Sequence, residues 1–239
     1  MKQLSLLLLM IILVSCSEST TSETVDKNTQ MLNYLAASGF NTENAIFEED
    51  RVIIEGDIAI RLEDLEKRMA NKTETRDKQW RTDYQISSSR VRNIRVRLSS
   101  SLDSDWKASA RSAMAQLNSV PNSAVYLYEV SSGEDIYVRH SSSVGSARGE
   151  FPSSSGRAGY SILISYNISP TGYYRNTMLH EFGHNIGLRH DHAPREGGVT
   201  WDHLIDGTPY SDTYSVMSYN RSRYFTNYDK IAIAELYPD

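Results

Sequence analysis

The sequence predicts an α+β fold, in which a mixed twisted sheet and a few helices follow a short N-terminal segment. Two observations lead to this prediction. From residue 91 onward, short runs that alternate apolar and polar side chains surround one longer stretch with helical spacing. The chain has 239 residues and is 39% hydrophobic, which is enough for one sizeable core and a smaller unit beside it.

The stretch 91–239 is expected to begin with the order β, α, β, β. Asp103 or Ser104 can cap the helix, because short polar side chains accept hydrogen bonds from the first free backbone N–H groups. Two further strands are joined by a Gly- and Ser-rich loop, and a C-terminal helix stops at Pro238. The expected elements are NIRVRL (93–98), WKASARSAMAQLN (106–118), AVYLYEV (124–130), DIYVRH (135–140), two strands within 144–167, and YDKIAIAELY (228–237).

Residues 30–90 are expected to form a separate small segment and a linker. It holds a short helix closed by Gly39, two apolar runs at 45–47 and 52–58, and a charged helix at 61–70. The following residues, 71–90, are polar without a clear period. They are interpreted as a linker, which is where processing proteases cut.

The first sixteen residues are typical of an export signal. A basic start precedes an apolar run from Leu4 to Val14, which is too short for a permanent membrane span. Residues 13–16 resemble the lipobox of bacterial lipoproteins, in which the cysteine, here Cys16, is lipidated. An ordinary secretory peptide is the alternative. Residues 17–29 are almost entirely polar, so we expect a flexible tether there.

Composition excludes several kinds of site. Cys16 is the only cysteine, so the chain has no disulfide, no thiol nucleophile beyond the signal and no zinc–thiolate site. The formal net charge is −5 and the basic residues are scattered, which argues against a nucleic-acid partner. The Ser-rich tracts have no base at nucleophile spacing, so a serine hydrolase is not indicated.

The stretch HEFGHNIGLRH, residues 180–190, contains three of the six histidines. His180 and His184, four apart on a helix, present two imidazoles on one face. Gly187 can take a positive φ, end the helix and return His190 as a third ligand. Glu181 lies beside the site, where a carboxylate can move a proton of a water molecule. The pattern predicts a catalytic zinc site rather than ordinary helix histidines, because three imidazoles leave one position open on the metal.

This stretch resembles the HExxHxxGxxH signature of the metzincin zinc endopeptidases. The segment YSVMSYN, residues 214–220, is similar to the Met-turn of serralysins and astacins. That resemblance implies that Met217 lies under the metal and that Tyr219 stabilises the oxyanion. Residues 147–165 are similar to the substrate-edge strand and following loop of the family, and residues 229–237 to its C-terminal helix. The bacterial dual-action HEIGH metallopeptidases are the most similar group overall, although Asp191 resembles the adamalysins.

The stretch IEGD, residues 54–57, resembles the astacin motif in which an aspartate from the pro-segment binds the zinc and keeps the enzyme latent. Asp57 is the matching residue, with Ile54 in place of the expected phenylalanine. An alternative interpretation is a turn between strand and helix, with Asp57 capping the helix that follows.

Taken together, the signal-like N-terminus and the resemblance imply an exported, monomeric bacterial zinc endopeptidase that acts on proteins or peptides. It would be anchored through Cys16 in the cell envelope, facing the periplasm or the cell surface, or else secreted. The alternatives are an inactive zinc-binding surface protein that binds a partner or a polysaccharide, and hydrolysis of a substrate other than a peptide. The remaining histidines, His140, His192 and His203, are expected to be exposed or structural.

Overall fold

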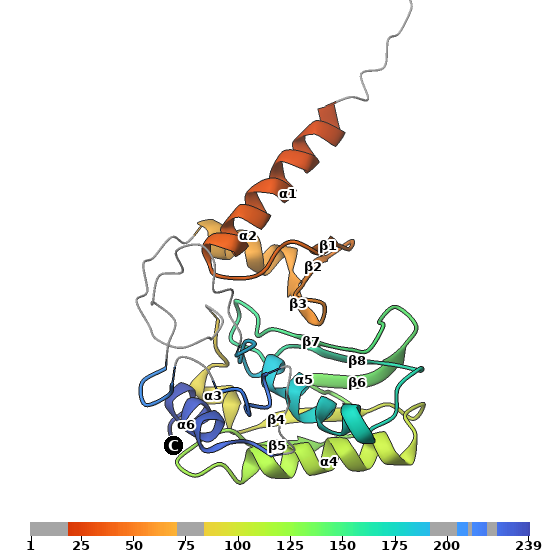
Figure 1. The fold of residues 1–239 in the computed structure, drawn as a ribbon, viewed down its shortest axis with the longest axis vertical. Helices are drawn as coiled ribbons and strands as arrows, with labels where there is room; N and C mark the ends of the chain where they lie inside the picture. Colours follow the sequence, from red (N-terminus) through yellow and green to blue (C-terminus); the bar gives the residue numbers. More distant parts are fainter. Residues whose placement is uncertain (1–18, 71–83, 192–204, 210–211, 219–223) are drawn as a thin grey trace, which may run out of the picture.

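A computed structural model describes residues 19–70, 84–191, 205–209, 212–218 and 224–239. It forms one eight-stranded mixed sheet in the order β1-β2-β3-β7-β8-β6-β4-β5 (Figure 1). The strands are β1 (Ile46–Phe47), β2 (Arg51–Ile54), β3 (Ile58–Arg61), β4 (Ile94–Leu98), β5 (Leu127–Glu129), β6 (Ile136–Ser141), β7 (Ala147–Glu150) and β8 (Ser161–Ser165). The helices are α1 (Ser19–Ala37), α2 (Leu62–Ala70), α3 (Ser88–Val91), α4 (Ser104–Asn118), the 3₁₀ helix η1 (Gly172–Asn176), α5 (Thr177–Asn185) and α6 (Asn227–Leu236).

The chain divides into an N-terminal unit, residues 19–70, and a C-terminal region, residues 84–239, each with its own core. The core of the C-terminal region centres on Trp106, Ile136 and Phe182, all fully buried. The N-terminal unit buries a smaller cluster around Leu35, Ile54 and Leu65. Phe151 of the C-terminal region joins this second cluster, so apolar packing and the shared sheet both connect the two parts.

The predicted order β, α, β, β is present as β4, α4, β5 and β6. β4 pairs in parallel with both β5 and β6, and α4 makes the crossover. Asp103 caps α4 by accepting a hydrogen bond from the Trp106 N–H at 2.9 Å, so the first of the two proposed caps is confirmed. Within the described residues, no helix combines the length and the apolar character needed to span a bilayer.

The predicted flexible tether at 17–29 is wrong from Ser19 onward, because α1 already begins there. Met31 and Leu35 anchor the helix in the core, and polar contacts continue it toward the N-terminus. Gln30 donates to the Asp26 carboxylate one turn earlier at 2.7 Å, and Lys27 pairs with Glu66 of α2 at 2.8 Å. Polar composition alone therefore did not exclude a helix here, because helix formation continues from a buried turn.

The expected linker, residues 71–90, is also too long at its C-terminal end. Residues 71–83 lie outside the described residues, but Ile86 is buried in the larger core and α3 begins at Ser88. The Ile86 N–H donates to the Tyr237 hydroxyl at 3.2 Å, so this segment contacts the C-terminal end of the chain. A single apolar residue in a polar stretch produces no periodicity, so the sequence pattern could not reveal this packing.

Candidate metal centre

Helix α5 carries the first two histidines of the predicted site. All nine of its residues are buried, and His180 and His184 lie one turn apart on the same face. The helix ends at Asn185, and Gly187 follows with φ +98°, as the sequence predicted. The N–H groups of Gly187 and Leu188 donate back to the carbonyls of His184 and Gly183, both at 2.9 Å. This left-handed turn brings His190 back toward the helix.

The three imidazoles converge on one point. The Nε2 atom of His180 lies 3.1 Å from His184 Nε2 and 3.2 Å from His190 Nε2. Nitrogen ligands about 2.0–2.1 Å from a tetrahedral zinc ion would stand about 3.3 Å apart. The spacing of the nitrogens therefore fits a single zinc ion.

The outer nitrogens determine which tautomer each ring adopts. His180 Nδ1 lies 2.8 Å from the Val216 carbonyl oxygen, and His184 Nδ1 lies 2.9 Å from that of Leu188. His190 Nδ1 lies 2.8 Å from Glu55 Oε2. Because these oxygens accept hydrogen bonds, each Nδ1 carries the proton and each Nε2 directs its lone pair inward. Three converging lone pairs need a cation between them, which is a second reason to assign a metal ion here.

Asp57 of the N-terminal unit supplies a fourth group. Its carboxylate oxygens lie 3.4 Å from His180 Nε2, 3.2 Å from His190 Nε2 and 3.9 Å from His184 Nε2. Ligand atoms of Asp57 and the three histidines all lie within 4.8 Å of one another. The alternative in which Asp57 caps a helix is wrong, because β3 intervenes and α2 begins only at Leu62. The predicted turn is present, since residues 55–57 connect β2 to β3.

The protein groups set the charges of this cluster. Burial lowers the pKa of His184 well below its usual value, helped by the neighbouring His180 and His190, so that ring is neutral. Burial also acts against the protonated form of His190, but Asp57 and Glu55 outweigh it and raise its pKa to about 9 when no cation lies between the rings. A bound metal ion would displace this proton from Nε2 and leave the lone pair described above. Burial would raise the pKa of Asp57, yet the three imidazoles, His190 foremost, hold it well below its usual value. The Asp57 carboxylate is therefore ionised at neutral pH.

Glu181 is fully buried, directly follows His180 in α5, and its carboxylate lies against β7. A Cβ atom built on Gly149 of β7 would meet Glu181 Oε2 at 3.1 Å and His184 Cβ at 2.9 Å. Only glycine therefore allows the strand to lie so close to the helix. Glu181 thus adjoins both the metal cluster and the strand that the sequence predicted as the substrate edge.

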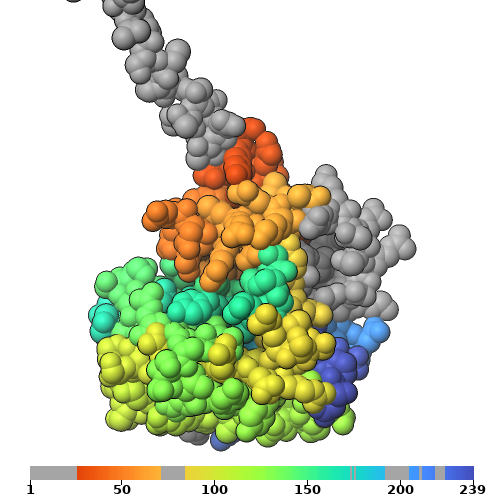
Figure 2. Space-filling model, turned by 180° about the vertical axis from the view of Figure 1, so that it is seen from behind, coloured from red at the N-terminus to blue at the C-terminus, as the bar shows by residue number. Residues whose placement is uncertain are grey.

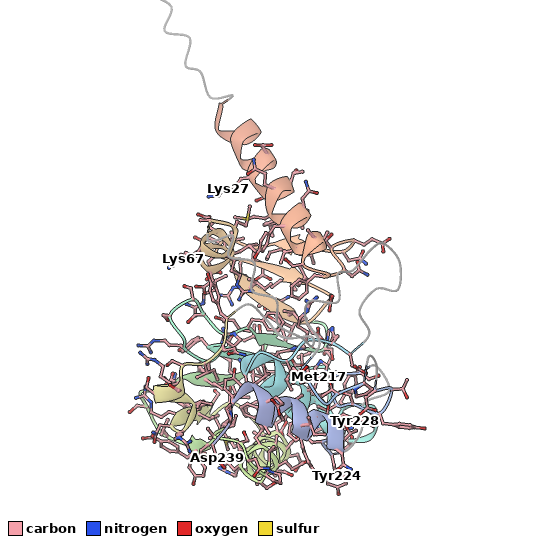
Figure 3. The ribbon with its side chains drawn as sticks, turned by 90° about the vertical axis from the view of Figure 1, so that its left-hand side faces the viewer. Lys27, Lys67, Met217, Tyr224, Tyr228 and Asp239 are labelled. Carbon is pink, nitrogen blue, oxygen red and sulfur yellow. The ribbon has the colours of Figure 1, made fainter. Side chains whose placement is uncertain are left out.

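Met217, which the resemblance places under the metal, is buried and packs against α5 (Figure 3). A Cβ atom on Gly183 would meet Met217 Sδ at 2.5 Å. This close contact explains why glycine occupies position 183, within HEFGH. Asp229 of α6 supports this turn, since it accepts hydrogen bonds from the Ser215 hydroxyl at 2.6 Å and the Val216 N–H at 3.1 Å. Val216 in turn holds the His180 ring through its carbonyl.

Several positions were not identified from the sequence. Glu55 contacts His190 from a distant part of the chain, and Arg189, which directly precedes His190, contacts the distant carbonyl of Ser38. No local pattern marks either residue. Asp229 had a usable signal, because it occupies the N3 position of a capping box with Thr226.

Of the other predicted residues, Tyr219, His192 and His203 lie outside the described residues. His140 lies away from the metal cluster and is structural, as expected: it stacks on Tyr166 at 4.7 Å between ring centroids.

Substitution of Gly149 tests the close approach of β7 to α5. We expect Gly149→Ala to lower the free energy of unfolding by about 1–3 kcal/mol, because its methyl group would press on the Glu181 carbonyl oxygen and on His184 Cβ. Urea denaturation of the full chain measures the change. Gly145→Ala is the matched control, since a Cβ there meets nothing within 4 Å. Equal stability of the two variants would contradict this account of the packing.

Comparison with known proteins places this geometry in context. A family model described as metallo-peptidase family M12, Reprolysin_5, matches residues 10–231. No curated protein matches the chain. Two solved structures of myroilysin are similar, one at 17% identity and TM-score 0.45 over 61% of this chain and 79% of that one. The other is at 15% identity and TM-score 0.46, over 86% and 96% of the two chains. High choriolytic enzyme 1, a hatching enzyme zinc-protease from Oryzias latipes, is similar at 18% identity and TM-score 0.43, over 64% and 93%.

Proposed function

Because the chain belongs to metallopeptidase family M12 and is a zinc metallopeptidase, we propose that it is an exported endopeptidase made as a latent precursor. The predicted metzincin-type fold and the zinc cofactor are confirmed at the level of this family. The finer likeness to the HEIGH group stays a prediction. The observation that carries the proposal is the convergence of three Nε2 atoms beside a buried glutamate, at the strand edge that a peptide would join.

The mechanism assigns a task to each part of the site. His180, His184 and His190 would hold zinc, which when bound supplies Lewis-acid chemistry that polarises a peptide carbonyl and lowers the pKa of water. Glu181 acts as the general base: its carboxylate takes a proton from the attacking water and passes it to the leaving amide nitrogen. Tyr219 keeps its predicted role of hydrogen bonding to the oxyanion. The N–H groups of Gly149 on β7 and of Phe151, directly after it, hold the substrate backbone by adding a strand to the sheet.

The N-terminal unit blocks this site in the full chain. β3 pairs in parallel with β7, and the carbonyls of Asp57 and Ala59 accept the N–H groups of Gly149 and Phe151 at 3.0 and 3.1 Å. The same backbone donors are therefore unavailable to a substrate. Figure 2 shows the orange N-terminal unit seated directly on the teal and green surface of the C-terminal region. Asp57 at the histidine cluster completes the block, in the manner that the resemblance to the astacin motif implies.

Arg189 fastens the N-terminal unit next to the metal cluster. Its guanidinium donates to the carbonyls of Ser38 and Gly39, each at 2.8 Å, and stacks 3.5 Å from the centroid of the Phe40 ring. These carbonyls belong to the two residues that directly follow the C-terminus of α1, where the helix dipole favours a cation. Removal of the unit by cleavage within 71–83 would release these contacts and open the edge of β7.

Metal removal tests the proposed activity. A protease site is introduced into residues 71–83, the folded chain is cut, and the C-terminal region is separated; this product is called the processed protein. We expect it to contain one zinc ion by elemental analysis and to cleave an unstructured protein. A chelator should abolish cleavage and equimolar zinc should restore it. Bound zinc without cleavage would instead support the inactive binding protein, and cleavage that resists chelation would overturn the metallopeptidase mechanism.

Export and anchoring through Cys16 rest on the signal-like N-terminus, which lies outside the described residues. The proposed location is a bacterial cell envelope. Cell fractionation tests it, since the Cys16→Ser variant should leave the membrane fraction. Retention of the variant in that fraction would remove the lipid anchor from the proposal.

A further inference from the structure

Strand β7 carries a buried carboxylate whose charged partners, among the residues that the structure describes, all come from the N-terminal unit. Glu150 is 2% exposed. Its Oε1 atom lies 2.6 Å from Arg61 Nε, and its Oε2 atom lies 3.5 Å from Arg51 Nη1. Arg51 and Arg61 are directly paired across β2 and β3, so both guanidinium groups reach the carboxylate from the same side of the sheet.

The C-terminal region offers this carboxylate no cation of its own among the described residues. There the hydrogen bond comes from the Ser161 hydroxyl on β8, at 3.0 Å. Once the N-terminal unit is removed, an ionised group in this position has one neutral donor and loses both guanidinium groups. A bound peptide that takes the place of β3 would cover this carboxylate again, and a cation on that peptide would compensate its charge as Arg61 and Arg51 do in the full chain.

The position of Glu150 places it within reach of a bound peptide. It lies between Gly149 and Phe151, whose N–H groups donate to β3 in the full chain. In the sheet Glu150 is paired with Ala59, and the side chains of paired residues point to the same face. Arg61, two residues beyond Ala59, points to that face as well. A peptide that takes the place of β3 would therefore direct one or two of its side chains toward this carboxylate.

From this arrangement we propose that Glu150 forms a specificity subsite for an arginine or lysine side chain of the substrate. In the full chain, Arg61 and Arg51 occupy this subsite as the substrate residue would. The inference rests on the proposed peptidase function, and it adds the class of substrate: peptides with a basic residue at one position near the scissile bond. The planar guanidinium suits a carboxylate better than an ammonium group does, so arginine is preferred over lysine.

The same contacts would also exist if Glu150 served only to dock the N-terminal unit. Arg148, on the same face of β7, illustrates that role with the opposite charge, because it pairs with Glu48 of the N-terminal unit at 2.7 Å. Docking contacts alone predict no preference among substrates once the unit has been removed. The two roles are therefore separated by kinetics of the processed protein.

The experiment uses a neutral peptide in which one arginine is moved through the four positions on each side of the scissile bond. A parallel set carries citrulline, which has nearly the same shape but no charge. We expect arginine to exceed citrulline in kcat/KM by about ten- to hundredfold at one position, because a hydrogen-bonded charge pair is formed there. In Glu150→Gln this ratio should fall to near one, whereas Arg148→Gln should keep or increase it.

Each outcome is decisive. An arginine-to-citrulline ratio near one at every position in the wild-type protein would overturn the subsite without requiring any variant to fold. A preference that persists in Glu150→Gln would overturn the assignment to this residue, with zinc content and the unfolding midpoint showing that the variant is intact. If the arginine-to-citrulline ratio is near one at every position while chelator-sensitive cleavage of both peptide sets continues, the proposed peptidase function stands and the subsite fails. Absence of cleavage in every peptide would overturn the peptidase function and, with it, the subsite that rests on that function.

Discussion

The processed Glu181→Gln variant should lose about 10²- to 10⁴-fold in kcat/KM while keeping its zinc. The substitution replaces the general base by an amide of nearly equal size, and general acid–base catalysis contributes a factor of this order. Glu181 is fully buried next to the histidine cluster but is not one of the converging nitrogen ligands, so metal binding should be unchanged. Steady-state cleavage of a fluorogenic peptide, with elemental analysis of the same sample, measures both quantities.

Glu129→Gln is the matched control for this variant. Glu129 pairs with Arg111 at the surface, at 2.7 Å, and exposed pairs of this kind contribute little. Its activity should equal that of the wild-type protein. If Glu181→Gln retained full activity with zinc bound, another group would have to move the proton, and the mechanism given for this site would be wrong.

The full-length Asp57→Ala variant should gain activity without being cut. The carboxylate that reaches the three imidazoles would be gone, and any substrate would compete only with the β3–β7 pairing. We expect at least a tenfold increase over the uncut wild-type chain, which corresponds to about 1.4 kcal/mol. The activity should remain below that of the processed protein, since the edge of β7 is still occupied. Peptide cleavage is measured, and electrophoresis shows that the chain remains whole.

Two further variants make the Asp57 result interpretable. Glu63→Ala removes an exposed carboxylate of α2, whose side chain is 77% exposed, and should leave the full chain latent. The double variant Asp57→Ala with Glu181→Gln should be inactive, which shows that the gained activity arises at this site. An uncut Asp57→Ala chain as inactive as the wild type would mean that strand pairing alone blocks the site.

Much of the C-terminal region followed from local sequence patterns. The spacing of His180, Glu181 and His184 places two rings and a carboxylate on neighbouring faces of any α-helix, whatever surrounds it. The turn at Gly187 and the cap at Asp103 are equally local, because each depends on the backbone within one helical turn. The family resemblance, carried by the same short stretch, led to the correct fold.

The tertiary structure decided what closes the site and what surrounds it. Asp57 and Glu55 reach the histidines only because β3 pairs with β7, a contact between residues that are distant in the chain. The ion pairs of Arg61 and Arg51 with Glu150 arise in the same way, as does the docking of Arg189 on Ser38 and Gly39. Helical spacing follows from the geometry of neighbouring peptide units. Strand pairing between distant segments depends on burial and on which edge is available, and a single sequence records neither.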